Sequence, residues 1–136
     1  FAAADPPQAC LDTASQQHTE FLCDLAEMHP ALTFNMVRVT PNGNRVYLVE
    51  AEITNTGRLP TMPVLAVNSR QVKKVRLEVT PGKGQTVAGG RSTFLYDRIL
   101  PGETVKTSWL ITGKGTVILR AGSPQTGTAT REVELK

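Results

Sequence analysis

The hydrophobic pattern of this 136-residue chain changes its period once, at Pro30. Before this proline, from Leu11 to Met28, apolar positions recur at intervals of three and four, as on one face of an amphipathic α-helix. A pair of prolines can open such a helix, and Pro30 should close it, because the residue before a proline is disfavoured in helical conformation. We therefore expect residues 1–30 to form a linker and an amphipathic helix.

Beyond Pro30, apolar residues alternate with polar ones, which is typical of strands with one buried face. The alternation is clearest at residues 47–53 and 75–79. Further strands are expected at residues 93–96, 105–111, 116–121 and 130–135. The segment 32–39 changes phase midway, which predicts a β-bulge or a strand covered on both sides.

Clusters of Gly, Pro and Asn separate these segments, and no helical pattern lies between them. Short strands punctuated in this way predict antiparallel pairing. We expect an all-β fold over residues 31–136, an immunoglobulin- or fibronectin-like β-sandwich of seven to eight strands preceded by one N-terminal helix. A closed barrel is the alternative. Aromatic residues make up only 5% of the chain, although Trp109 and Tyr47 both fall on predicted inward faces.

The net charge is +3, and the densest basic cluster is Arg70, Lys73, Lys74 and Arg76. It reads either as a solvated strand face or as a patch for nucleic acid or anionic lipid. No aromatic residues interleave with it as stacking platforms, which favours the solvated face and predicts no nucleic-acid partner. No apolar run approaches the roughly 20 residues that span a bilayer, so we expect no membrane insertion.

Two cysteines, Cys10 and Cys23, lie in the helical segment. On one helix they would be separated by about 19 Å on nearly opposite faces, whereas a disulfide needs Cα atoms within about 7 Å. We expect free thiols unless Cys10 lies in a loop that folds back, and the cysteines do not identify the compartment. The first residues lack the regions of a signal peptide, and we expect the chain to be a piece of a longer polypeptide.

Residues for catalysis are sparse. The two histidines, His18 and His29, do not have the spacing of a zinc-binding helix. The segment Gly113–Thr116 resembles a phosphate-binding loop only superficially and is interpreted as a hairpin turn. Acidic pairs such as Glu50 and Glu52 fall on outward strand faces. We therefore predict no catalytic residue, cofactor site or metal site in this chain.

Three stretches carry a family resemblance: "HTEFLCDLAEMHPAL" at residues 18–32, "VYLVEAEITNTGRLPT" at 46–61, and the tail 109–135. Together they resemble the region after the catalytic domain in bacterial zinc metallocarboxypeptidases of the carboxypeptidase A type. That family takes zinc ligands from an H-x-x-E pair and a distant histidine. Here Phe21 stands three positions after His18, and Leu32 three after His29, so no zinc ligand carries over, and no general base or substrate-binding arginine is matched.

The resemblance implies a non-catalytic accessory domain that positions or stabilises the N-terminal catalytic domain of the same polypeptide. Zinc would belong to that parent domain, which removes C-terminal residues from peptides. Export is also implied, hence a secreted or periplasmic location, while the oligomeric state stays open. The helix would dock either on the sandwich or on the missing catalytic domain through Phe21, Leu22, Leu25 and Met28.

Within the second stretch, Asn55, Gly57 and Pro60 form a predicted structural turn. Gly57 would supply a positive φ, Asn55 would bond its own main chain, and Pro60 would restrict the exit. Two other functions stay open beside the accessory role. One is a stand-alone ligand-binding or adhesion module of a secreted protein, and the other, disfavoured by the lack of reactive groups, is an enzyme.

Overall fold

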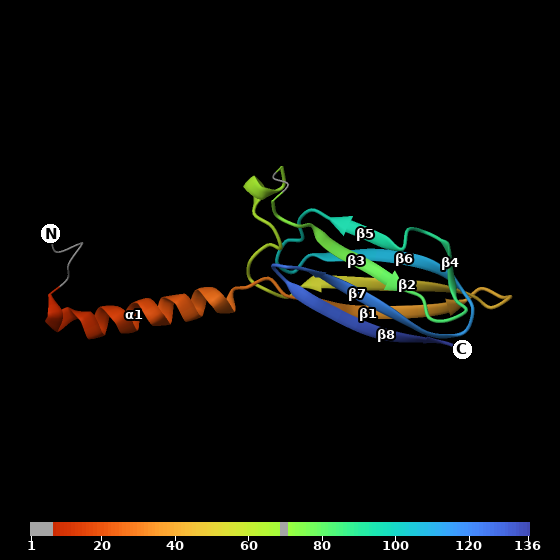
Figure 1. The fold of residues 1–136 in the computed structure, drawn as a ribbon, viewed down its shortest axis with the longest axis horizontal. Coiled ribbons are helices and arrows are strands. Elements are labelled where there is room, and N and C mark those ends of the chain that lie inside the picture. The colour runs from red at the N-terminus through yellow and green to blue at the C-terminus, as the bar shows by residue number, and fades with distance from the viewer. Residues whose placement is uncertain (1–6, 69–70) are drawn as a thin grey trace.

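The computed structural model describes residues 7–68 and 71–136 and shows one helix followed by an antiparallel β-sandwich (Figure 1). Helix α1 spans Gln8–Glu27. The strands are β1 (Leu32–Pro41), β2 (Val46–Asn55), β3 (Val75–Thr80), β4 (Thr86–Gly89), β5 (Thr93–Tyr96), β6 (Thr104–Thr112), β7 (Gly115–Ser123) and β8 (Gly127–Leu135). A short 3₁₀ helix, η1 (Val64–Ala66), lies in the long connection between β2 and β3.

The strands form two sheets of four, in the orders β1-β2-β6-β4 and β5-β3-β7-β8. With β1, β2, β3, β6, β7 and β8 as strands A, B, C, E, F and G, the sheets contain the ABE and CFG orders of an immunoglobulin-type sandwich. Strand β5 extends the second sheet beyond β3, and β4 takes the place of strand D beside β6. Two separate sheets confirm the predicted sandwich and exclude the barrel.

The core lies between the sheets and follows from the alternation in the sequence. Strand β2 alternates strictly between half-buried and buried residues along its whole length, and Leu77 and Leu119 are buried from the facing sheet. Trp109 is buried as predicted, with its ring edge against Phe94 at a centroid distance of 5.9 Å and its Nε1 donating to the Arg91 carbonyl at 3.0 Å. Tyr47 is also buried, and its hydroxyl donates to the Lys136 carbonyl.

The predicted irregularity in the first strand is a β-bulge. The pairing of β1 with β2 shifts between Phe34 and Met36, because an extra residue, Asn35, opposes one position of the partner strand. The amide of Asn35 donates to the Thr54 hydroxyl on the exposed side. The change of phase in the sequence therefore recorded a real feature of the backbone.

Helix α1 projects from one end of the sandwich rather than packing on it (Figure 1). It begins after Pro7 without a side-chain cap and ends at Glu27, three residues before Pro30, where the sequence predicted its end. Pro30 itself is buried. The start of β3 and the turn between β7 and β8 lie at this same end of the sandwich (Figure 1).

Candidate functional site: an exposed helix face and a basic groove

The apolar stripe of α1 is open to solvent. The exposed fractions are 63% for Phe21, 61% for Leu22 and 46% for Leu25, whereas Met28, at the junction with the sandwich, is half-buried. The helix therefore does not dock on its own sandwich, which was one of the two surfaces considered for it. Cys10 and Cys23, also on α1, are free and exposed.

The junction between α1 and the sandwich is built around Asn55, the last residue of β2, whose side chain is fully buried. Its Oδ1 accepts from the backbone N–H of Ala31 at 3.3 Å and of Gly57 at 3.1 Å. Its Nδ2 donates to the carbonyls of Leu59 at 2.8 Å and Ile99 at 3.2 Å. All four hydrogen-bonding positions of the amide are used, so one side chain joins the entry to β1, the turn after β2 and the segment before β6.

Gly57 occupies this turn for a different reason from the one predicted. Its φ is not among the positive values of the chain, so the expectation of a left-handed residue here is wrong. Instead, an added Cβ would lie 2.2 Å from the carbonyl oxygen of His29 and 2.6 Å from Cα of Pro30. The glycine is required because the segment leaving α1 crosses directly over it.

Further main-chain bonds hold the same junction. The N–H of Leu59 donates to the Met28 carbonyl at 3.0 Å, and that of Thr56 to the Ala31 carbonyl at 2.8 Å. Pro60 is half-buried and leads into Thr61, which exchanges two hydrogen bonds with Ile99, one through its N–H and one through its hydroxyl. The predicted turn residues thus converge on one structural junction, at the base of α1.

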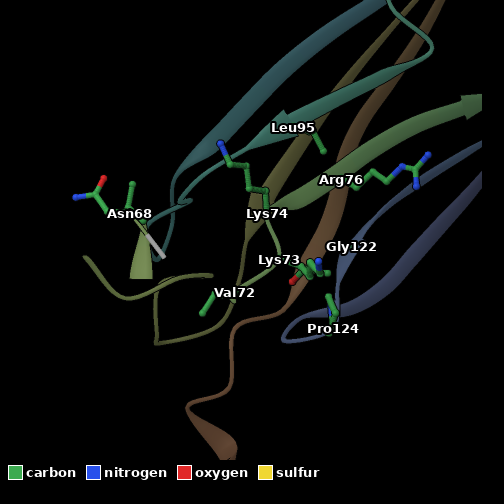
Figure 2. Close-up of a pocket in the computed structure, with 10 residues that line it drawn as sticks. Asn68, Val72, Lys73, Lys74, Arg76, Leu95, Gly122 and Pro124 are labelled. Atoms are coloured by element: carbon green, nitrogen blue, oxygen red, sulfur yellow. The ribbon is translucent and has the colours of Figure 1, made fainter. Parts of the chain in front are cut away.

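A groove lies on the outer face of the second sheet, beside the long β2–β3 connection (Figure 2). Its volume is about 680 Å³, which is in the range of pockets that take small ligands or a few side chains. Residues of four kinds line it: apolar Val67, Val72 and Leu95; cationic Lys73, Lys74 and Arg76; polar Asn68; and Gly122–Pro124 at the end of β7. A second hollow of about 620 Å³ continues it past Arg76 toward Arg120 and Thr128.

The cations of this groove are only partly neutralised. Lys74 forms an ion pair with Asp97, and Arg76 forms one with Glu78 at 2.9 Å. All four side chains are partly exposed to solvent. Exposed pairs of this kind hold their partners weakly. In the part of the chain that the structure describes, Lys73 forms no ion pair. The basic cluster, predicted to be a solvated strand face, therefore also lines the groove. Arg70 of the same cluster lies outside the described residues.

The distribution of charge along the sequence is a signal for this surface that no short motif carries. All 15 Lys and Arg residues lie in residues 31–136 with 7 acidic residues, whereas residues 1–30 hold the other 5 acidic residues and no Lys or Arg. The helical segment is therefore acidic and the sandwich strongly basic. The net charge of +3 conceals this division.

Groups for metal or acid–base chemistry do not gather in the described residues, which contain no cluster of three or more His, Cys, Asp or Glu side chains. His18 and His29 are both exposed at or after α1. On the opposite sheet from the groove, the Lys106–Glu52 pair, with Nζ and Oε1 2.5 Å apart, raises the pKa of Lys106, chiefly through the hydrogen bond to Glu52 and its charge. No helix in residues 7–68 or 71–136 is long and apolar enough to cross a membrane.

The fold and these surfaces define a β-sandwich domain that carries a projecting helix. Residues 31–134 match the family described as "Domain of unknown function (DUF8731)", and the chain belongs to that family. The matched segment begins just after α1. No curated protein matches the chain.

Two solved structures are similar to the chain over part of their length. One is a GH3 β-glucosidase from Bifidobacterium adolescentis, with 18% identity and a TM-score of 0.37, covering 78% of this chain and 17% of that chain. The other is DesR, a β-glucosidase from Streptomyces venezuelae in complex with D-glucose, with 16% identity and a TM-score of 0.31, covering 76% and 15%. The chain thus spans less than a fifth of either protein.

Proposed function

We propose that this chain is a non-catalytic accessory domain that orients a neighbouring domain of its polypeptide, with α1 as its docking element. The observation that carries the proposal is the uncovered apolar stripe of Phe21, Leu22 and Leu25. Folded proteins rarely leave a contiguous apolar patch open unless it is a contact surface. A twenty-residue helix without a side-chain cap also depends on packing for much of its stability.

The sandwich supplies a firm base for such an element. Its buried core cluster begins at Leu32 and draws on no residue of α1, so the sandwich does not need the helix for its core. The hydrogen bonds of Asn55, Thr56 and Leu59 to the segment between Met28 and Ala31 fasten the end of α1. A domain held by α1 would therefore be held in a set orientation to the sandwich.

The sequence resemblance supplies the neighbour: the catalytic domain of a bacterial zinc metallocarboxypeptidase, joined on the N-terminal side of α1, secreted or periplasmic. Zinc and catalysis belong to that domain in this proposal. Reading the coding sequence upstream of Phe1 tests it directly, since an H-x-x-E segment followed by a distant histidine is expected there. A coding sequence with neither would contradict the carboxypeptidase assignment.

The docking role is tested in the complete polypeptide. Replacing Phe21 and Leu25 by Asp should lower the temperature at which the neighbouring domain loses activity, because its contact with α1 is lost. Thr13→Asp, exposed on the N-terminal half of the helix and outside the stripe, is the matched control and should leave that temperature unchanged. Equal effects of the two changes would argue against docking through the stripe.

A second candidate, a stand-alone ligand-binding module of a secreted protein, is favoured by the groove beside Lys73 and Arg76. The upstream sequence discriminates between the two, because a stand-alone module needs no catalytic domain. A groove variant, Arg76→Glu, would then remove binding, whereas substitutions in α1 would not.

A further inference from the structure

The acidic residues of α1 form a second stripe beside the apolar one. Glu20, Asp24 and Glu27 recur at intervals of four and three and therefore share one side of the helix. Each directly precedes a residue of the apolar stripe, namely Phe21, Leu25 and Met28, so the two stripes are adjacent. A surface that accepts this helix needs an apolar strip with cations along one border.

The acidic stripe is unfavourable for α1 standing alone. It lies toward the C-terminal end of the helix, where the macrodipole is negative and acidic side chains are destabilising. The last turn contains no basic residue. Within the described residues, no side chain of α1 takes part in an ion pair. Cations from outside α1 would remove this repulsion.

The groove on the second sheet has the complementary chemistry. Leu95 opposes Arg76 in the pairing of β5 with β3, and Val72 adds to the apolar lining. Figure 2 shows the side chains of Lys74, just before β3, and of Arg76, on β3, pointing apart on either side of Leu95 in that view. The groove thus combines apolar Val67, Val72 and Leu95 with the cations Lys73, Lys74 and Arg76, the two kinds of side chain that the paired stripes of α1 require.

We propose that α1 of one copy of this chain docks in the groove of a second copy. The inference shares with the proposed function that α1 is a docking element, and it differs in the receiving surface, which is the groove of a second copy in place of a neighbouring domain. Phe21, Leu22 and Leu25 would pack on the apolar residues of the groove, and Glu20 and Asp24 would meet its cations, Lys73, Lys74 and Arg76. This is recognition of an amphipathic helix by a groove through anchors at intervals of three and four.

The placement of the two surfaces makes the contact reciprocal. Helix α1 leaves the sandwich at the end where β3 begins and β7 meets β8, which is also the end that carries the groove (Figure 1). Two copies that meet end to end can therefore exchange helices, each filling the groove of the other. Such a two-fold arrangement closes on itself, and the expected assembly is a dimer rather than a filament.

The experiment measures the molar mass of the 136-residue chain over a concentration series by sedimentation equilibrium, with a reductant present so that Cys10 and Cys23 cannot cross-link copies. We expect a monomer–dimer equilibrium. Leu22→Glu and, separately, Arg76→Glu should each raise the dissociation constant at least about tenfold, as for residues at the centre of an interface. Thr13→Glu, nine residues before Leu22 on the exposed N-terminal half of α1, and Lys114→Glu, away from the groove, are the matched controls.

Charge exchange tests the pairing itself. A helix variant (Glu20→Lys with Asp24→Lys) and a groove variant (Lys73→Glu with Arg76→Glu) should each dimerise weakly alone, and mixing them should restore a heterodimer. A wild-type chain that stays monomeric at every concentration overturns the proposal. So does a dimer that the groove variants leave intact. If α1 variants still dissociate that dimer, only the groove is wrong, whereas insensitivity to both sets of variants would mean that the dimer forms through another surface. The proposed function is tested separately, by the temperature at which the neighbouring domain of the complete polypeptide loses activity.

Discussion

Replacing Asn55 by alanine should remove a fully buried side chain that makes four hydrogen bonds. The substitution leaves four backbone groups without their partner, namely the N–H groups of Ala31 and Gly57 and the carbonyls of Leu59 and Ile99. An unsatisfied buried group costs about 1 to 3 kcal/mol. Three of these bonds are only partly buried, so water can replace some of them, and the lower figure applies. The expected loss of unfolding free energy is about 4 kcal/mol, which is exceptional for one substitution.

The assay is equilibrium unfolding in guanidinium chloride followed by the fluorescence of Trp109, the single tryptophan of the chain, which is buried in the core. Asn35→Ala is the matched control, because it makes the same chemical change on the exposed side of β1, where the amide bonds only Thr54. That change should stay within about 0.5 kcal/mol. A loss below about 1 kcal/mol for Asn55→Ala would refute the reasoning, since it would mean that water satisfies all four groups.

Three further predictions concern neighbouring features. In the same assay, Gly57→Ala should lower the free energy of unfolding by about 1 to 3 kcal/mol, because the new Cβ meets the backbone of His29 and Pro30. Gly89→Ala is the control and should be tolerated, because its Cβ would meet only Leu110, at ordinary contact distances. For the monomer, Leu22→Ala should leave the free energy of unfolding of the sandwich within about 0.5 kcal/mol of wild type, since the core contains no residue of α1. A larger change would mean that α1 does stabilise the sandwich. Lys106→Met should shift the urea midpoint by a constant amount from neutral pH to about pH 10. The raised pKa of Lys106 means that its stabilisation is lost at the alkaline end only as the pH rises through that raised value; a difference that vanished near neutral pH would contradict this sign.

The sequence was sufficient for most of the fold because alternation and helical spacing are local properties. The end of α1 and the faces of β2, β3 and β6 follow from which positions are apolar, and even the bulge at Asn35 left its mark as a change of phase. Strand β4 was not predicted, because its own sequence lacks a clear alternating pattern. It has four residues, of which only Val87 is a β-branched apolar residue, and it is held in place by pairing with β6.

The junction and the groove depend on contacts that no local pattern records. The turn at Gly57 was predicted correctly, but the reason for the glycine was not. Local turn rules consider only neighbouring residues, whereas here residues 29–31 pack directly against the glycine. The groove requires the connection after β2 to meet the turn after β7, about fifty residues later in the chain. Its cations were visible in the sequence, with Val72 next to Lys73, but only the fold shows that Leu95 lies beside them.

The division of charge between helix and sandwich has a consequence for how the two parts can be arranged. An acidic helix and a basic sandwich in one chain attract each other, and yet α1 stands away from its own sandwich. The fastened junction at Asn55 and Gly57 explains this, because it fixes the direction in which the chain leaves β1 and keeps α1 from folding back. The attraction is then available only to a surface on another molecule or domain, so the same hydrogen bonds that stabilise the turn also direct the helix outward.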